Sequence, residues 1–517
     1  MAAFAAPVFA AANPFTDVPE GHWAYDAVAQ LAARGVISDD LGGTFNGPQP
    51  VTRYEVASIL ARALSSVDFD KAGKADIEML ERLTVEFSDE LSALLADATV
   101  GSFYSRLGEY VDVPDSPDFH KDLEAAKSAS ESVNAFAFDM YAELAKDKEG
   151  DVFFSPYSIS AAMAMLYAGA TGEAEEEIRD VMHYGPDIHD SGKSLRTVLN
   201  ISALRTRAEL LTANAVWPSE KIKLLDEYRQ TIKKYYDGEI TELDYAEKWR
   251  EAEDTINRWT NEKTRGVIEK IIPEGLLKPE ASGLSEAAFV ITNAIYFKSG
   301  WKHEFQTSNT EDAPFYKGGG KNPADVKMMR QRIDGISYFN SPEFQMLRLP
   351  YGSGDYSMIV ILPRDGKTGE GASTELSSLE AGLTYGKFAE YLSRMRNAVV
   401  DLYLPKFEAE QNLDIVGNFQ RLGLKAILDY RYDTLDRMRE KDNYAYGVKY
   451  ILHKARVSVD EIGTEAAAAT AIIGWRFSGV FEIPETEIVE FRADHPFMFF
   501  IMNRDTILFM GRYTGPK

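Results

Sequence analysis

The stretch that decides the fold is Glu461-Ile462-Gly463-Thr464-Glu465-Ala466-Ala467-Ala468-Ala469-Thr470-Ala471, near the carboxyl end of the chain. Alanine and glutamate are good helix formers, so a helix is one interpretation. The next residues, 472–479, include two glycines and continue a helix poorly. A run of alanine and threonine that leads to the tip Trp475-Arg476-Phe477 is also suited to a narrow slot between existing strands. We therefore expect a segment that can enter a sheet.

The region around this stretch, residues 121–517, mixes two kinds of apolar pattern. Helical spacing dominates its first half, in Val133–Leu144 and Ile159–Tyr167. Strand-like runs follow in Ala288–Ile291, Tyr356–Leu362, Val399–Leu404 and Phe497–Met502. Helices and strands do not alternate regularly, which favours an α+β architecture with an extensive, largely antiparallel sheet.

This region contains a series of short distinctive motifs. They are Phe154-Ser155-Pro156-Tyr157-Ser158-Ile159, Asn214-Ala215-Val216-Trp217, Ile256-Asn257-Arg258-Trp259 with Thr264-Arg265-Gly266, Thr292–Lys298 with Trp301 and Phe305, Leu404-Pro405-Lys406-Phe407, His453-Lys454-Ala455 and His495–Phe500. In this order they resemble the signature segments of the serpin family of serine protease inhibitors. The resemblance implies a serpin fold for residues 121–517, with large antiparallel-rich sheets, about nine helices and an exposed reactive loop.

The family resemblance implies a trapping mechanism. A serine protease cuts the reactive loop and forms an acyl-enzyme, and the cut loop then inserts into the main sheet as an added strand. The residues that the resemblance assigns to the hinge of this loop are Glu461, Gly463, Thr464, Glu465, Ala466, Ala467, Ala468, Ala469 and Thr470. Alternate residues of an inserted strand face the core, here Thr464, Ala466, Ala468, Thr470 and Ile472. None is charged and none is proline, so we expect an inhibitor rather than a substrate.

The position of the reactive bond follows from the family's usual loop length. The bond usually comes sixteen positions after the glutamate matched by Glu461, which places it between Phe477 and Ser478. An aromatic bait implies a chymotrypsin-like, cathepsin G-like or subtilisin-like target. A loop shorter by one residue would place the bond between Arg476 and Phe477 and imply a trypsin-like target.

The resemblance also assigns shutter and breach residues that control opening of the sheet: Ser155, Pro156, Ser158, Asn293 and His453. Ser155 carries a signal of its own, because serine caps helices and Pro156 suits a first helical position. The sequence contains no HExxH, G-x-S-x-G, P-loop or dinucleotide-binding motif in context. We expect no enzyme, no metal site and no cofactor.

The amino-terminal region, residues 13–66, has motifs of another kind. They are Phe15-Thr16-Asp17-Val18-Pro19, His22-Trp23-Ala24, Gly43-Thr44-Phe45 and Thr52-Arg53-Tyr54-Glu55, the last of which is also a helix capping box. They resemble a small helical S-layer homology (SLH) module, a family that binds cell-wall polymers of bacteria. The resemblance assigns contact with a wall polymer or peptidoglycan to Trp23 and Arg53, because an indole face stacks on sugars and a guanidinium binds anionic groups. The alternative is a core role for Trp23 and a plain surface position for Arg53.

In residues 74–96, mainly apolar side chains recur at alternating intervals of three and four residues, so they would form one stripe along a helix. Its members are Ile77, Leu80, Thr84, Phe87, Leu91 and Leu94. Such spacing predicts a short coiled-coil-like helix, which would form a homotrimer through residues 77–94 and so group three SLH modules. The alternative is an amphipathic helix that packs on a neighbouring domain. Residues 97–120, with Pro114 and Pro117, are predicted to be a linker.

Composition limits the remaining function classes. The chain has 517 residues, long enough for two or more domains, and no cysteine, which excludes disulfides and thiolate sites. Its 81 acidic and 56 basic residues give a net charge of −25, which argues against nucleic acid as a partner.

The apolar run of residues 1–12 is too short to span a membrane and is predicted to be the tail of a signal peptide, or else a flexible alanine-rich end. The sequence thus predicts an exported, envelope-associated inhibitor of serine proteases, and the alternative is an envelope protein with a serpin fold that does not inhibit.

Overall fold

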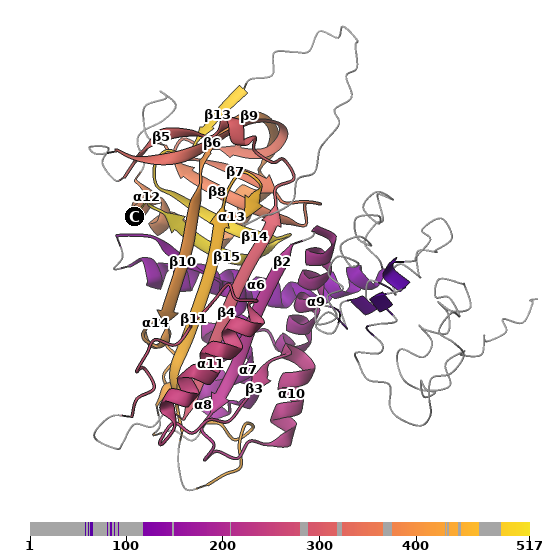
Figure 1. The fold of residues 1–517 in the computed structure, drawn as a ribbon, viewed down its shortest axis with the longest axis vertical. Helices are drawn as coiled ribbons and strands as arrows, with labels where there is room; N and C mark the ends of the chain where they lie inside the picture. The colour runs from indigo at the N-terminus through magenta and orange to yellow at the C-terminus, as the bar shows by residue number, and fades with distance from the viewer. Residues whose placement is uncertain are drawn as a thin grey trace, which may run out of the picture. The chain divides into compact units, whose positions relative to one another are not determined.

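The computed structural model describes residues 117–146, 149–206, 208–279, 288–317, 323–364, 375–429, 431, 434–442, 446–464 and 488–516, together with eleven scattered residues between 57 and 91. The chain divides into two compact units, Met1–Lys121 and Asp122–Lys517. The second unit carries both of the sheets in the described part of the chain (Figure 1).

Nine α-helices lie within the described residues from 117 onward. They are α6 (Pro117–Ala145), α7 (Pro156–Gly169), α8 (Gly172–Val181), α9 (Ile188–Thr206), α10 (Asp226–Tyr236), α11 (Trp249–Lys263), α12 (Leu376–Gly382), α13 (Tyr385–Ser393) and α14 (Val416–Leu422). Both predicted helical stretches are confirmed within α6 and α7. However, α6 begins at Pro117, inside the predicted linker, because the fixed backbone of proline suits a first helical turn.

The larger sheet has nine strands among the described residues. Its order is β1 (Val152–Phe154), β15 (Thr506–Tyr513), β14 (Phe497–Asn503), β8 (Tyr356–Pro363), β7 (Phe344–Pro350), β6 (Pro323–Asn340), β9 (Arg396–Pro405) and β13 (Ile488–Arg492), with β5 (Glu311–Tyr316) beside β6. All neighbours are antiparallel except β13 and β9, which are parallel. Three predicted strands are thereby confirmed, in β8, β9 and β14.

The second sheet has six described strands. Its order is β10 (Phe407–Asp414), β11 (Val448–Val459), β12 (Gly463–Thr464), β4 (Phe289–Gly300), β2 (Glu209–Pro218) and β3 (Glu239–Ile240), and β11 also pairs directly with β4. The β11–β4 and β2–β3 pairs are parallel, and the others are antiparallel. The fourth predicted strand is confirmed in β4, and so is the predicted α+β class with antiparallel-rich sheets.

Helix α7 lies between the two sheets, in contact with β2 and β4 on one side and β15 on the other. Its sequence, PYSISAAMAMLYAG, is apolar around most of its circumference, which is typical of a fully buried helix. The predicted cap is confirmed: Ser158 N donates to Ser155 Oγ at 3.2 Å, and Pro156 is the first helical residue.

In the amino-terminal unit, the described members of the predicted helical stripe in residues 74–96 are Leu80, Thr84, Phe87 and Leu91. Each is at most 4% exposed within a single chain. Ile77 and Leu94 lie outside the described residues, and association through residues 77–94 stays a prediction. Trp23 and Arg53 lie outside the described residues. In the part of the chain that the structure describes, no helix is long and apolar enough to cross a membrane.

Candidate functional site: a parallel seam and its hinge

The centre of the site is the junction of β4 and β11 in the six-stranded sheet, which we call the seam. The two strands pair in parallel from Phe289 with Val448 to Tyr296 with Arg456. Figure 1 shows them side by side along the length of the unit. Parallel neighbours can accept an antiparallel strand between them, because each offers main-chain donors and acceptors on the facing edge. The seam is therefore a place where the sheet can gain a strand.

Strand β12 already enters the seam at one end. Gly463 and Thr464 pair with Gly300 and Ser299 of β4, and Thr464 also pairs with Val459 of β11. Thr464 is fully buried, and its hydroxyl lies 2.6 Å from the hydroxyl of Tyr351. Two residues of the predicted hinge thus occupy the position of an inserted strand. Residues 465–487, with the rest of the predicted hinge and both alternatives for the reactive bond, lie outside the described residues.

Main-chain hydrogen bonds hold the hinge at this entrance. Trp301 N donates to Ile462 O, and Phe305 N donates to Glu461 O, each at 2.8 Å. The indole of Trp301 donates to Asp460 O at 2.9 Å and stacks on Tyr351, with ring centres 4.4 Å apart. Neither Asp460 nor Tyr351 was assigned from the sequence.

Glu461 adds a charged anchor. Its carboxylate accepts from Lys406 Nζ at 2.7 Å and from Thr310 Oγ1 at 2.8 Å, and its side chain is only 8% exposed. Burial works to raise the pKa of this carboxyl, but the hydrogen bonds outweigh burial and lower the pKa below its ordinary value. Glu461 therefore stays ionised and fixes the start of the loop to Thr310, which directly precedes β5, and to Lys406, which lies between β9 and β10.

Gly463 is required by a close backbone approach. A Cβ atom at this position would lie 2.1 Å from Ser299 O and 2.7 Å from Gly300 Cα. Both atoms belong to the backbone of β4, which cannot move aside without breaking the pairing of β12. Any larger residue must displace the hinge from the seam.

The Gly463→Ala variant is accordingly expected to be destabilised by about 1–3 kcal/mol, the usual cost of overpacking. Denaturant titration should show a lower midpoint than wild type. Gly386→Ala is the matched control, because its Cβ would meet no atom within 4 Å. Equal midpoints for Gly463→Ala and wild type would contradict the tight fit at the seam.

A buried polar network, the shutter, joins the middle of the seam to α7. His453 of β11 and Asn293 of β4 are register partners, and His453 Nδ1 lies 2.5 Å from Asn293 Oδ1. Asn293 Nδ2 donates to Ser158 O at 2.7 Å and also to Asn214 Oδ1 of β2. One hydrogen bond of this network therefore crosses the seam itself and must break when a strand enters.

The network fixes the protonation of His453. Ser155 N donates to His453 Nε2 at 3.0 Å, so this nitrogen must be unprotonated and the proton is carried by Nδ1, which donates to Asn293. Burial lowers the pKa of His453 to about 3. The imidazole is neutral at physiological pH, and a second proton would face the N–H of Ser155.

The four predicted shutter side chains that make hydrogen bonds, Ser155, Ser158, Asn293 and His453, are thus brought together. Asn214 was quoted in a motif but given no role, and the structure adds it to the network. Lys406 and Trp301 were likewise quoted only as motif residues. Asp460 directly precedes the hinge but was given no role. Thr310 and Tyr351 come from segments without a distinctive local pattern, so no sequence signal could have found them.

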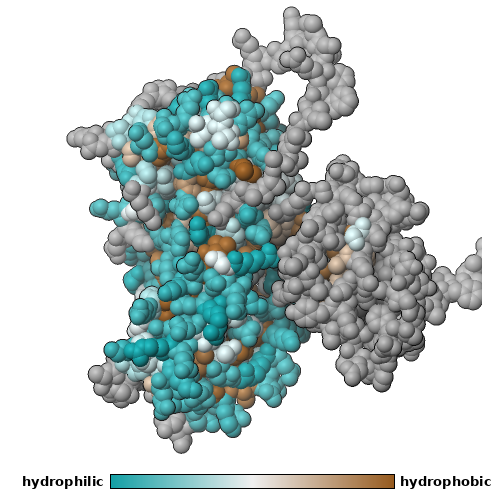
Figure 2. Space-filling view, viewed as in Figure 1, coloured by the Kyte–Doolittle hydropathy of each residue, from teal (hydrophilic) through white to brown (hydrophobic). Residues whose placement is uncertain are grey.

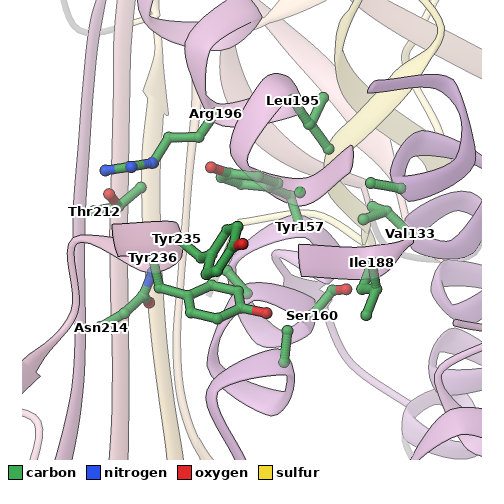
Figure 3. Close-up of a pocket in the computed structure, with 14 residues that line it drawn as sticks. Val133, Tyr157, Ser160, Ile188, Leu195, Arg196, Thr212, Asn214, Tyr235 and Tyr236 are labelled. Carbon is green, nitrogen blue, oxygen red and sulfur yellow. The ribbon is translucent and has the colours of Figure 1, made fainter. Parts of the chain in front are cut away.

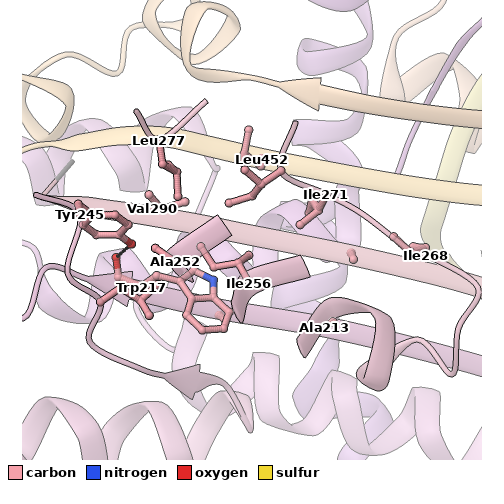
Figure 4. Close-up of a cluster of buried hydrophobic side chains, with 14 residues drawn as sticks. Ala213, Trp217, Tyr245, Ala252, Ile256, Ile268, Ile271, Leu277, Val290 and Leu452 are labelled. Atoms are coloured by element: carbon pink, nitrogen blue, oxygen red, sulfur yellow. Dashed lines mark hydrogen bonds between the residues drawn. The ribbon is translucent and has the colours of Figure 1, made fainter. Parts of the chain in front are cut away.

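Helix α11 covers the outer face of the seam. Figure 4 shows Ala252 and Ile256 of α11 directed at Val290 of β4 and Leu452 of β11. Trp217 of β2 packs in the same cluster and accepts a hydrogen bond on its carbonyl from Tyr245 at 2.9 Å. Because this cluster spans both sides of the seam, the strands cannot separate without disturbing the contact with α11.

A pocket lies beside the shutter, between α7, α9, α10 and β2 (Figure 3). Tyr157, Arg196, Asn214 and Tyr236 are among the residues that line it. Its volume is about 40 Å³, which leaves room for a few water molecules. Burial raises the pKa of Tyr157 to about 12, so this phenol is no acid or base near neutral pH. The pocket is a packing gap too small for a substrate.

Comparison with known proteins bears on the whole second unit. Residues 131–516 match the family described as Serpin (serine protease inhibitor), and residues 14–57 match the S-layer homology domain. A similar protein, the uncharacterized serpin-like protein of Methanosarcina mazei, is 34% identical over 407 residues, which are 74% of this chain and 86% of that protein.

Two further relatives extend the similarity to animal proteins. The leukocyte elastase inhibitor of Sus scrofa is 33% identical over 391 residues, covering 74% of this chain and 97% of that protein. The crystal structure of maspin superposes with a TM-score of 0.64 at 25% identity, over 76% of this chain and all of maspin. The likeness therefore spans the α+β unit from end to end.

Proposed function

The chain belongs to the serpin family and carries an S-layer homology domain, and on that premise we propose that it is a suicide inhibitor of serine proteases. Serpins are usually protease inhibitors rather than enzymes. The observation that carries the proposal is the seam: β4 and β11 pair directly while Gly463 and Thr464 have begun to enter between them. A strand position is thus open next to a hinge of small residues.

The proposed reaction uses this open position. The protease serine attacks the reactive bond and becomes an acyl-enzyme, and the new amine leaves with the carboxyl-terminal fragment. The loop then follows Thr464 into the seam, gains main-chain hydrogen bonds on both edges and carries the protease away from its starting place. Distortion of the protease active site prevents hydrolysis of the acyl bond. The uncharged inward positions after Thr464 support complete insertion.

The target is proposed from the bait residue. Cleavage between Phe477 and Ser478 suits a chymotrypsin-like or subtilisin-like protease, and cleavage between Arg476 and Phe477 suits a trypsin-like one. The name of the porcine relative, leukocyte elastase inhibitor, describes inhibition of a serine protease by a protein of the same family.

The decisive experiment is incubation with chymotrypsin, trypsin, elastase and subtilisin separately, followed by denaturing electrophoresis and mass spectrometry. A band at the summed mass is expected with the matching protease. A released peptide that begins at Ser478 identifies Phe477 as the bait, and one that begins at Phe477 identifies Arg476. Cleavage without a covalent band by every protease would contradict inhibition.

The S-layer homology domain suggests association with the cell envelope, and we propose that it binds a wall polymer or peptidoglycan through Trp23 and Arg53. Full-length protein should sediment with purified cell walls, whereas Trp23→Ala and Arg53→Ala should remain in solution. Trp249→Ala is a control because Trp249 belongs to the second unit. Trimerisation through residues 77–94 is a finer proposal, and sedimentation equilibrium of the full-length protein measures it.

A further inference from the structure

A cavity of about 380 Å³ lies at the end of the unit where β5, β6 and β9 meet. None of the seam, hinge or shutter residues lines it. Its volume is within the range of small-molecule binding sites. In Figure 2 the end of the unit formed by β5, β6, β9 and β13 is mainly hydrophilic, which suits a polar ligand.

Charged side chains of alternating sign line this cavity. Glu311 of β5 is the register partner of Met328 of β6, and Arg332 of β6 is the partner of Asp401 of β9. Arg330 lies between them on β6 and interacts electrostatically with both Glu311 and Asp401. The order of charges along the cavity is therefore Glu311, Arg330, Asp401 and Arg332.

The inner charges of this row are already paired. Asp401 accepts from Arg330 at 2.8 and 3.2 Å, and these bonds lower the pKa of its carboxyl. Arg492 of β13 also lines the cavity, where its guanidinium stacks on Tyr403 and donates to Glu490 at 3.3 and 3.4 Å. With Glu490 included, three arginines face three carboxylates, so the cavity carries no excess of either sign.

The outer charges of the row are not paired. Glu311 and Arg332 are exposed, and neither side chain makes a hydrogen bond or ion pair with any residue that the structure describes. The cavity is therefore negative at one end and positive at the other. Four strand positions separate Met328, the partner of Glu311, from Arg332, which is about 13 Å along β6.

This arrangement indicates the chemical class of the ligand. A free anion would be repelled at long range by the net charge of −25, whereas a zwitterion carries no net charge. The ammonium and carboxylate of a single amino acid are attached to one carbon and cannot reach both ends of the row. An extended peptide of three residues spans about 10 Å, which matches the distance once both side chains lean into the cavity.

We propose that this cavity binds a short peptide with two free ends, about three residues long, whose ammonium group pairs with Glu311 and whose carboxylate pairs with Arg332. The guanidinium of Arg332 offers a planar pair of donors that fits a carboxylate. Hydrolysis of peptide bonds is the class of reaction that supplies such a ligand, because it creates both free ends. The inference is independent of the proposed function, since it requires no attack on the loop.

The test is isothermal titration calorimetry of the full-length protein with tri-alanine, N-acetyl-tri-alanine and tri-alanine amide. Tri-alanine should bind with a Kd of about 1 mM, as expected for a ligand of this size. Each blocked form should bind about fivefold more weakly, because it lacks one exposed ion pair. Free alanine should also bind more weakly, and equal binding of alanine and tri-alanine would overturn the assigned length.

Two variants assign the ends of the peptide. Glu311→Gln should bind tri-alanine and its N-acetyl form equally while it still discriminates against the amide, and Arg332→Gln should show the reverse. Glu269→Gln and Arg258→Gln remove exposed charges outside the cavity and should discriminate as wild type does. The site is refuted if wild type binds the three forms equally, binds none of them at about 10 mM, or if both cavity variants keep both preferences.

Discussion

The Thr464→Arg variant is expected to lose nearly all covalent complex with a protease that the wild-type protein traps, while its loop is still cleaved. Thr464 is fully buried between β4 and β11, where its hydroxyl meets Tyr351. An arginine there would place an unpaired charge among buried residues, at a cost of several kcal/mol. Thr464 already occupies the entrance of the seam, so we expect the arginine to be expelled from it. The charge must return to this buried position before any later residue can follow, and insertion is slowed.

Speed determines the outcome because insertion competes with hydrolysis of the acyl bond. A barrier raised by about 3 kcal/mol slows insertion more than a hundredfold. The fraction of attacked molecules that end as stable complex should therefore fall below about a tenth, whereas the total rate of attack on the loop should change little. Titration of a fixed amount of protease with increasing inhibitor, resolved on a denaturing gel, measures both quantities.

Thr464→Ser is the matched control. It keeps a small side chain and the hydroxyl that faces Tyr351, so complex formation should remain close to wild type. If Thr464→Arg trapped protease as completely as Thr464→Ser, the seam between β4 and β11 would not be the route of the loop. Loss of complex in both variants would instead indicate damage to the fold.

The parts of the site that sequence could predict are those whose chemistry is local. Ser155 and Pro156 specify a helix start by themselves, and the run of small residues after Glu461 is compatible with a strand inserted between two others. The family resemblance placed Thr464 among the inward residues of an inserted strand, and Thr464 is buried at the entrance of the seam. In each case the deciding neighbours lie within a few residues.

The parts that sequence could not predict depend on long-range pairing. The sequence indicated a largely antiparallel sheet, yet the seam is one of its parallel pairs, set by residues more than 150 positions apart. Tyr351 and Thr310 meet the hinge only because the ends of β4, β7 and β5 converge there. No local pattern distinguishes such residues from ordinary turn and strand positions.

Acid is expected to weaken the closed seam through His453. Its pKa is about 3 in the folded protein, against about 6.5 in an unfolded chain. Because the folded pKa is depressed, the unfolded chain binds a proton first as the pH falls. The stabilisation is fully present above pH 6.5 and is lost progressively as the pH falls from 6.5 toward 3.

Between pH 7 and pH 4 this single group should remove about 3 kcal/mol from the free energy of unfolding, at 1.36 kcal/mol for each pH unit below the unfolded pKa. His453→Gln removes the titration while an amide can still accept from Ser155 N and donate to Asn293. Denaturant unfolding at pH 7, 6, 5 and 4 should therefore show a smaller acid-induced loss for His453→Gln than for wild type. His120→Gln, on the exposed surface of α6, should behave as wild type.

The same proton has a consequence for trapping, because the His453–Asn293 hydrogen bond crosses the seam. Once the imidazole is charged, its two N–H groups cannot both be satisfied by the present partners, since Ser155 N also donates. The added proton on Nε2 faces the N–H of Ser155, so the contact between β11 and the start of α7 breaks and a charge is left buried in the seam. The loop should then enter the seam without a protease. Wild type held at pH 4 and returned to pH 7 should have lost trapping activity faster than His453→Gln. Equal losses would mean that the seam opens in acid through the carboxylates of the hinge, Glu461 first among them, rather than through the shutter.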